Sequence, residues 1–370
     1  MNIKKHIVIL DFLRGIAALL VVFGHTRSMI FLDYTPTNLL FEKFFYAVTS
    51  LGHQAVILFF VLSGFFISRS VVNNDAIDKF SWFNYFVKRL TRLWCVLIPA
   101  LFLTYIIDWV GIYSSLSAAV YGGYSGSSVL QKIVSDDLTF ANLISNALFI
   151  PTDIIPVLGS NGSLWSLSLE FWSYILFPLI FFMNKASVTR KILYFFLIVL
   201  ILYLIGVKGG VYFLIWLLGL VPVYISFSNK KNTIIFFSIS VLLFSVAILA
   251  ARAQIINDFV FGALIVPLII SSLNIDTSKF LFFEKVSKFL SKISFSMYAI
   301  HLPIVVLFKA ILIGDQRLPF GIQSLVLFLI CLILVTLSSY FFWYLFERNT
   351  NKIQNIILTN KSIFSKASKS

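Results

Sequence analysis

The chain alternates long apolar runs with short polar connections, and the runs are long enough to cross a membrane. A membrane-spanning helix needs about 20 mostly apolar residues. Such runs occupy residues 7–31, 44–68, 93–110, 164–183, 190–207, 210–227, 233–250, 257–273, 293–313 and 323–346. The pattern therefore predicts an all-α, polytopic transmembrane helical bundle with about ten spanning helices. One transmembrane domain is expected over residues 1–350, followed by a polar cytoplasmic tail over 351–370, in which residues 361–370 are expected to be mobile.

Two apolar stretches need a separate interpretation, one at the N-terminus and one in the middle of the chain. The first run follows Lys4 and Lys5, as a signal peptide would, but it contains Arg14 and continues beyond the usual length. We therefore expect a retained first helix. The apolar stretch 138–151 is too short to span the membrane, so it is expected to be re-entrant or interfacial.

Composition supports a membrane protein and argues against a nucleic-acid-binding one. Only 12% of the residues are charged and 59% are apolar, with a mean hydropathy of +0.96. A soluble domain is about 25% charged, so most of this surface must face lipid. The net charge is +14, and the basic residues that cause it lie mostly between the apolar runs. Membrane topology therefore explains this charge without nucleic-acid binding. Cys95 and Cys331 lie on separate runs, so neither a disulfide framework nor a metal site is expected.

The distribution of lysine and arginine predicts how the chain is oriented. With the N-terminus inside, 21 of the 29 basic residues fall in inner segments, seven fall in outer segments or outer helix ends, and Arg14 lies within the membrane. Cytoplasmic connections carry such an excess of basic residues. Both termini are therefore predicted to be cytoplasmic, and the long connection 111–163 to lie outside.

Several polar residues lie inside the apolar runs, where a charge is costly and usually functional. Arg14 and His25 are eleven residues apart on the first run, so a helix places them on one face, about 16 Å apart along its axis. Helical rise puts Glu170, on the fourth run, at the outer level with His25. The same estimate puts His301, on the ninth run, at the inner level with Arg14.

Each of these residues also has a structural explanation. Asp11 and Arg14 can form a local ion pair, Glu170 can be satisfied by a neighbouring helix, and His301 can be a packed hydrogen-bonding residue. His53 lies on the second run without a charged neighbour, which favours a structural role. The combination of Arg and His on one face with a carboxylate at matching depth favours a catalytic site over these alternatives.

Six segments in order resemble the motifs of the membrane acyltransferase-3 family, which includes bacterial O-acetyltransferases. They are RGIAALLVVFGH (14–25), FFVLSGFFIS (59–68), KRLTRLWCVLIP (88–99), SLWSLSLEFWSYILFP (163–178), SFSMYAIHLPIV (294–305) and WYLFERN (343–349). In the last, Asn349 stands where the family often has proline. The resemblance covers nearly the whole chain.

The resemblance implies ten helices in the bacterial inner membrane, a cytoplasmic acyl-CoA donor such as acetyl-CoA, and no metal. It also implies an acceptor at the opposite side, a glycan or glycolipid. Family acceptors include lipopolysaccharide sugars, capsules, peptidoglycan, root-nodule signals and macrolides, and a surface-glycan hydroxyl is expected here. Some members carry a fused esterase-like domain, which is not expected in this chain. The sequence leaves the oligomeric state open.

These residues suggest a mechanism with several open points. We expect His25 to act as the general base on the acceptor hydroxyl, with Glu170 orienting its ring, or else to carry the acyl group covalently. Lys88, Arg89 and Arg92 are expected to bind the donor phosphates, unless they only anchor the topology. Arg14 is expected to bind a donor carbonyl or phosphate, or to stabilise the oxyanion of the intermediate. His301 is expected to position the donor.

A transporter or flippase is the main alternative, because buried His, Glu and Arg also form proton or substrate sites. Inverted repeats or paired broken helices would favour it. The two halves of the chain have no clear repeat of that kind. The acyltransferase hypothesis therefore accounts for more of the sequence.

Overall fold

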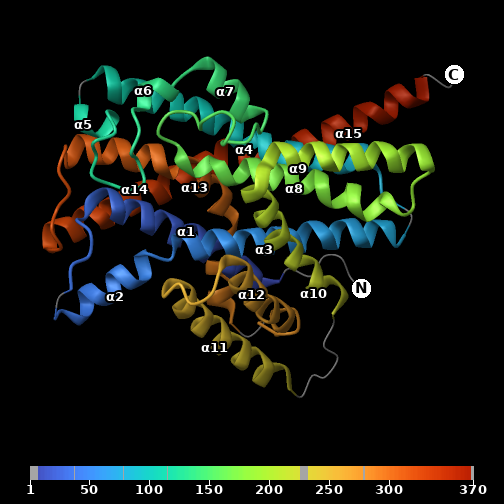
Figure 1. The fold of residues 1–370 in the computed structure, drawn as a ribbon, viewed down its shortest axis with the longest axis horizontal. Coiled ribbons are helices and arrows are strands. Elements are labelled where there is room, and N and C mark those ends of the chain that lie inside the picture. The colour runs from blue at the N-terminus through green and yellow to red at the C-terminus, as the bar shows by residue number, and fades with distance from the viewer. Residues whose placement is uncertain are drawn as a thin grey trace. The chain divides into compact units, whose positions relative to one another are not determined.

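The structure is a computed structural model that describes residues 7–36, 38–77, 79–114, 116–225, 232–277 and 280–367, with side chains described to residue 359. Within these ranges the regular structure is helical, apart from one isolated bridge between Phe31 and Leu318. The helices are α1 (Val8–Ile30), α2 (Leu40–Thr49), α3 (Gly52–Asp75), α4 (Trp82–Tyr113), α5 (Ala118–Tyr121), α6 (Val134–Asp137), α7 (Phe140–Ala147), η1 (Gly162–Leu164), α8 (Trp165–Met183), α9 (Val188–Leu217), η2 (Leu218–Leu220), α10 (Val221–Tyr224), α11 (Thr233–Arg252), α12 (Asp258–Ser272), α13 (Leu281–Leu312), α14 (Ile322–Leu345), η4 (Glu347–Asn349) and α15 (Thr350–Ala367) (Figure 1). The predicted all-α polytopic class is confirmed.

Among the described residues, eight helical segments are long and apolar enough to cross a membrane, fewer than the ten expected. Two features account for the difference. The predicted spans 190–207 and 210–227 both lie in the segment Val188–Tyr224, which counts as one candidate span although Gly206, next to the predicted boundary, has a non-helical conformation. The predicted span 257–273 is α12, whose 15 residues rise only about 22 Å. Each predicted run thus forms a helix, but not each forms a separate full-length span.

Gly206 divides α9 into two helical stretches. Its φ of 64° lies in the left-handed region, which glycine adopts without the steric cost that a Cβ would add. α9 is kinked at this residue. No atom lies within 4 Å of the position where a Cβ would be, so the backbone conformation, and not packing, favours glycine here.

The helices divide into two compact units, which we describe separately. The first unit comprises Met1–Gly24, Lys43–Val72 and Ser166–Ser294. In it, α3 packs closely on the end of α9 and on η2, because both contact surfaces carry a glycine. A Cβ on Gly64 would lie 1.8 Å from the Trp216 carbonyl oxygen, and a Cβ on Gly219 would lie 2.3 Å from the Phe65 nitrogen. Asp11 accepts a hydrogen bond from Ser291 at 2.9 Å, which joins α1 to α13.

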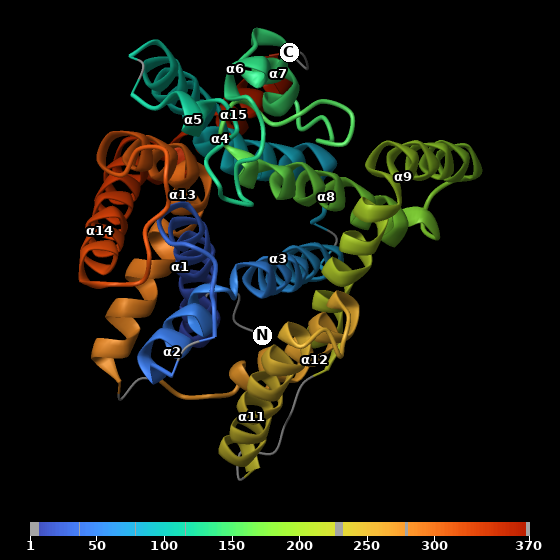
Figure 2. The ribbon, with the colours of Figure 1, turned by 60° about the vertical axis from the view of Figure 1, so that its left-hand side comes forward.

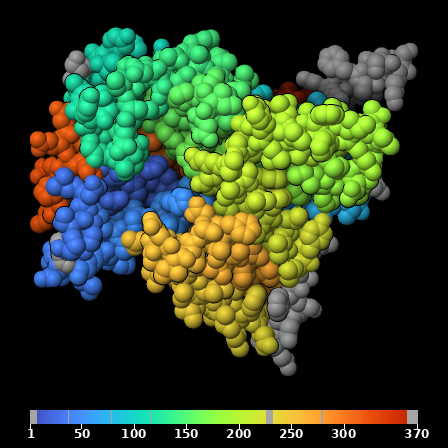
Figure 3. All heavy atoms as spheres, in the orientation of Figure 1, coloured from blue at the N-terminus to red at the C-terminus, as the bar shows by residue number. Residues whose placement is uncertain are grey.

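The outer helices of the first unit expose apolar faces. Only 11% of the apolar window of α11 and 17% of that of Val188–Tyr224 are buried. Figure 3 shows the side chains of α11 and α12 lying side by side on one face of the first unit. An exposed apolar area of this size matches a lipid-facing surface.

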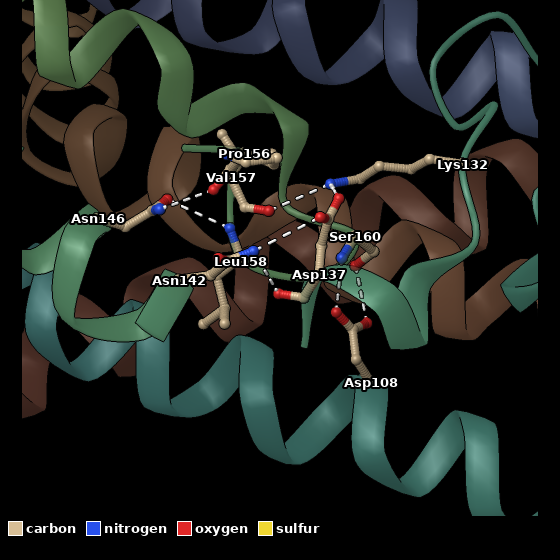
Figure 4. A network of polar contacts seen from close by, with 9 residues as sticks. All are labelled: Asp108, Lys132, Asp137, Asn142, Asn146, Pro156, Val157, Leu158 and Ser160. Atoms are coloured by element: carbon tan, nitrogen blue, oxygen red, sulfur yellow. Dashed lines mark hydrogen bonds and ion pairs between the residues drawn. The ribbon is translucent and has the colours of Figure 1, made fainter. Parts of the chain in front are cut away.

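The second unit comprises His25–Glu42, Asn73–Trp165 and Phe295–Ser370. Its connection between α4 and α8, predicted as a long outer loop, folds into α5, α6, α7 and η1. A polar network holds it together (Figure 4): Lys132 contacts Asp137 at 2.5 Å, the Asn146 amide donates to the Pro156 carbonyl at 3.1 Å, and Asp108 of α4 accepts from Ser160 at 2.7 and 2.8 Å. The stretch 138–151, expected to be re-entrant or interfacial, contains α7.

The predicted polar tail begins where α15 begins. Residues 350–367 form a helix, which the hydropathy pattern did not predict. Ile353 and Ile357 are exposed, whereas Gln354 and Leu358, four residues apart on one face of the helix, are partly buried. α15 lies beside α4 (Figure 2).

Candidate active site

Two histidines from distant parts of the chain meet in the second unit. His25, near the end of α1, and His301, in the middle of α13, approach to 2.8 Å between Nδ1 of His25 and Nε2 of His301. Their rings are nearly parallel, with a 17° interplanar angle and centroids 5.1 Å apart. His301 is fully buried, whereas His25 is partly exposed. The pair therefore presents one ring with an accessible edge and a second, buried ring behind it.

Hydrogen bonding determines which nitrogens carry protons in the neutral pair. Nδ1 of His301 lies 3.1 Å from the Met297 carbonyl and 2.9 Å from the Tyr298 carbonyl, and carbonyls only accept. Nδ1 of His301 must then carry the proton, so its Nε2 is an acceptor. His25 donates to that acceptor from Nδ1, which leaves Nε2 of His25 with a free lone pair. That nitrogen is suited to take a proton or to attack a carbonyl carbon.

A buried polar network fixes the helical turn that holds His301. The Asn161 amide donates to the Ala299 carbonyl at 2.9 Å and to Thr104 at 3.0 Å. Ser163 donates to Asn161 at 2.8 Å, and the Tyr298 hydroxyl donates to the Ser163 carbonyl at 2.9 Å. These bonds join α4, the segment before α8 and α13. Side chains locked in this way hold a catalytic ring in a defined orientation.

Sequence reasoning missed the members of this network. Asn161 and Ser163 belong to the segment GSNGS that directly precedes the fourth run, and this cluster of small polar residues beside a span was the available signal. Tyr298 was part of a quoted motif but received no role. None of the three is titratable near neutrality, so a search for charged groups passes over them.

The predicted depth of His301 is wrong. Helical rise placed His301 at the inner level with Arg14, but its contact with His25 places the two histidines at one level. The estimate assumed that the ninth span enters the membrane near Ile293, whereas α13 begins at Leu281. Helical rise gives distances along one helix, but the offset between two helices depends on their packing.

Glu170 has its own hydrogen-bond partners in the first unit. Its carboxylate accepts from the Ser63 hydroxyl at 2.8 Å and from the Tyr174 hydroxyl, and Ser63 also accepts from the Trp216 indole at 3.3 Å. These bonds link α8, α3 and α9, as expected if a neighbouring helix satisfies the carboxylate. The orienting role of Glu170 toward His25 stays a prediction.

The basic cluster of α4 lies within a helix that begins earlier than predicted. α4 starts at Trp82, capped by the Ser81 hydroxyl, so Lys88, Arg89 and Arg92 occupy its second and third turns. Lys88 and Arg92 are exposed, whereas the Arg89 guanidinium lies over the Tyr85 ring at 5.4 Å. Two cations are therefore available to a ligand on this face, and the third is held against an aromatic ring.

Arg14 and His53 complete the polar residues singled out from the sequence. α1 runs without a break from Val8 to Ile30, so it carries both Arg14, which is partly buried, and His25. The role of Arg14 stays a prediction. The expectation that His53 has no charged neighbour is wrong, because its Nε2 lies 2.8 Å from the Asp258 carboxylate at the start of α12. The sequence could not reveal a partner 205 residues away.

Two of the quoted motifs are also brought together. Glu347, from the C-terminal motif, accepts from the backbone N–H of Ser296 at 3.2 Å and from its hydroxyl at 2.6 Å. Ser296 lies five residues before His301 on α13. Within the described part of the chain, no group of three or more His, Cys, Asp or Glu gathers as a metal site would require.

Comparison with known proteins identifies the family of the chain. The family model described as Acyltransferase domain matches residues 7–344, and the chain therefore belongs to that acyltransferase family. The resemblance to the acyltransferase-3 family is confirmed.

Two curated relatives match part of the chain. An O-acetyl transferase of Shigella phage Sf6 is 30% identical over 167 residues, which are 45% of this chain and 43% of that protein. Acyltransferase MdmB of Streptomyces mycarofaciens is 32% identical over 181 residues, 49% of this chain and 40% of that protein. The matched part thus spans less than half the length of either relative. No solved structure matches the chain.

Proposed function

We propose that this protein is an O-acyltransferase of the bacterial inner membrane, of the O-acetyltransferase type. It transfers an acyl group from cytoplasmic acyl-CoA, such as acetyl-CoA, to a hydroxyl of a surface glycan such as a lipopolysaccharide O-antigen or capsule sugar. The observation that carries the proposal is the His25–His301 contact, which leaves Nε2 of His25 as a free base at an accessible edge. Family membership and the two partial relatives support the reaction class.

The proposed chemistry uses His25 as a general base. Nε2 takes the proton of the acceptor hydroxyl while the hydroxyl oxygen attacks the thioester carbonyl carbon. Collapse of the tetrahedral intermediate breaks the carbon–sulfur bond, and the imidazolium returns the proton to the CoA thiolate. His301 holds the His25 ring, because both of its own nitrogens are engaged by His25 and by backbone carbonyls. This orienting role replaces the donor contact expected from the sequence.

A covalent route remains the alternative for His25. Nε2 attacks the thioester directly, CoA leaves as a thiol, and the acyl-imidazole then passes its acyl group to the acceptor. The tautomer deduced for the pair serves both routes, since each needs a lone pair on Nε2. Arg14, eleven residues earlier on α1, is assigned to the donor carbonyl or to the oxyanion. Glu170 is retained as a second candidate for supporting the His25 ring.

Transfer of label tests the function directly. The purified protein in lipid nanodiscs, given acetyl-labelled CoA and a glycan acceptor, is expected to release CoA thiol and to label the acceptor in equal amounts. The label should be lost on mild alkaline treatment, because it is an O-ester. Substrate flux into proteoliposomes without any acyl donor would instead indicate a transporter and overturn the proposal.

Removing Arg89 and Arg92 is expected to weaken donor binding. A charge-assisted hydrogen bond to phosphate contributes about 1.5 to 3 kcal/mol, so the KM for acetyl-CoA should rise at least about tenfold with kcat nearly unchanged at saturation. Arg92→Ala alone isolates the charge, because Arg92 is exposed while Arg89 also contacts the Tyr85 ring. Steady-state kinetics measures this effect.

The matched control is Arg190→Ala, which removes an exposed arginine at the start of α9. It should leave the KM for acetyl-CoA unchanged. Equal KM values for the wild-type protein and the Arg89→Ala/Arg92→Ala variant would show that the cluster does not bind the donor and serves only to anchor the topology.

A further inference from the structure

The second unit contains a buried lysine with no role in the proposed chemistry. Lys309 lies in the last turn of α13 and is fully buried. Its Nζ makes no hydrogen bond to any described residue. An ammonium group has three donors, and burying it without acceptors is costly, above all within a membrane span. The C-terminal carbonyls of α13 lie near its backbone and favour a cation there, but none accepts from Nζ.

One cation and one carboxylate act on Lys309. Arg317 and Asp315, which follow α13, lie within electrostatic reach of Lys309. Arg317 is committed elsewhere: its guanidinium holds Asp33 by two hydrogen bonds of 2.9 Å, and these bonds lower the pKa of Asp33 below its usual value. Asp315 accepts from the Ser117 hydroxyl at 2.5 Å. Both carboxylates thus have partners of their own, and neither bonds to the Lys309 ammonium.

Arg27 adds a further cation to this part of the unit. It lies two residues after His25 on α1 and also acts electrostatically on Asp33. The end of α1 is joined to the segment after α13, because the Leu318 N–H donates to the Ile30 carbonyl at 2.8 Å and the Leu32 N–H donates to the Leu318 carbonyl at 2.9 Å. Among the described residues, three cations and two carboxylates therefore gather at this end of α1 and α13.

The position of Lys309 relative to the histidine pair is set by α13. Lys309 follows His301 by eight residues, a rise of about 12 Å. Side chains on a helix lean toward its N-terminus, so the ammonium lies on the His301 side of its own Cα. An acceptor that contacts both the histidine pair and Lys309 must therefore span a distance of about 12 Å along α13, which an oligosaccharide can do.

We propose that Lys309 binds an oxyanion carried by the acceptor, a carboxylate of an acidic sugar or a phosphate of its linkage. The proposal rests on the acyltransferase function above and names the acceptor class that this end of α1 and α13 selects. An anionic group supplies the acceptors that the buried ammonium lacks. A neutral glycan has no anionic group and therefore cannot make this contact with the ammonium.

Paired acceptors test the proposal by transfer. Two oligosaccharides that differ only in a hexose or its uronic acid are given to the wild-type protein with labelled acetyl-CoA. Lys309→Met is expected to raise the KM for the acidic acceptor at least about tenfold, as for the loss of a charge-assisted hydrogen bond. The KM values for the neutral acceptor and for acetyl-CoA should not change. Lys43→Met, at an exposed lysine of α2, is the control and should change none of the three.

A binding measurement keeps this inference separate from the proposed function. Glucuronate, a sugar 1-phosphate and dodecyl phosphate are titrated against the protein, and the shift in melting temperature is recorded. Stabilisation by the sugar anions points to the glycan as the source, and stabilisation by dodecyl phosphate alone points to a lipid carrier. Lys309→Met and Lys309→Gln should abolish either shift; the Gln variant keeps a polar group if the Met variant does not fold.

The outcomes are distinguishable. Anion binding that depends on Lys309, without transfer to any acceptor, would overturn the proposed function and leave the oxyanion site standing. Transfer by the wild-type protein, with equal acidic-acceptor KM values and equal anion shifts in the Lys309 variants, would overturn the site and leave the function standing.

Discussion

Replacing His25 with alanine is expected to lower acyl transfer at least about 100-fold, because a positioned general base contributes about 10² to 10⁴ to the rate. The variant removes the Nε2 lone pair that the hydrogen bonds to His301 leave free. Folding should survive, since His25 is partly exposed and its loss leaves only one ring nitrogen of His301 without a partner. The measurement is the rate of label transfer, with the melting temperature as the check on folding.

His53→Ala is the matched control for the His25 variant. His53 is an exposed histidine paired with Asp258 in the first unit, so its removal tests the loss of a histidine without the loss of the proposed base. It should keep near wild-type transfer. Retention of most activity by His25→Ala would show that the base lies elsewhere.

The same variants separate the two routes open to His25. Incubation with labelled acetyl-CoA and no acceptor should label the wild-type protein only if an acyl-imidazole forms. Label that is absent from His25→Ala and lost on adding acceptor would establish the covalent route. Wild-type protein that stays unlabelled while transferring normally would establish general base catalysis.

Removing His301 is expected to cost less than removing His25 and to act through it. His301→Ala leaves Nδ1 of His25 without its acceptor, so the ring loses its orientation and its defined tautomer. Misplacement of a catalytic group by about 1 Å costs about 100-fold, so we expect kcat to fall by about tenfold to 100-fold. The KM for acetyl-CoA should change little, because the proposed donor contacts, Lys88, Arg89 and Arg92, lie on α4.

Two further readouts distinguish positioning from a structural role for His301. His301→Gln offers an amide oxygen that can accept from Nδ1 of His25, so it should recover part of the activity that alanine loses. The double variant His25→Ala/His301→Ala should be no slower than His25→Ala alone, because residues that act as a unit are not additive. Equal, additive losses from both alanine variants, with no recovery by glutamine, would assign His301 to folding only.

The sequence predicted the membrane helices well because their signal is local. An apolar stretch of about 20 residues in lipid must form its backbone hydrogen bonds within itself. It therefore forms a helix whatever its neighbours are. The predicted runs correspond to helices from α1 to α14. The main error lies where local hydropathy is silent, at Trp82, where the polar start of α4 extends the helix beyond its apolar run. The predicted break between the runs 190–207 and 210–227 lies beside the left-handed Gly206 within α9.

The candidate site shows the opposite balance. The sequence by itself determined that four polar residues lie inside apolar helices, where burying them costs free energy: Arg14, His25, Glu170 and His301. It also determined that Arg14 and His25 share α1. Both follow from composition and helical spacing, which are properties of single segments. Only the tertiary structure decided that His25 pairs with His301 across 276 residues, that carbonyls fix the tautomer of the pair, and that Glu170 bonds to Ser63 and Tyr174. The physical reason is that a hydrogen bond depends on the relative offset and rotation of two helices, which packing of their side chains sets and which no single helix encodes.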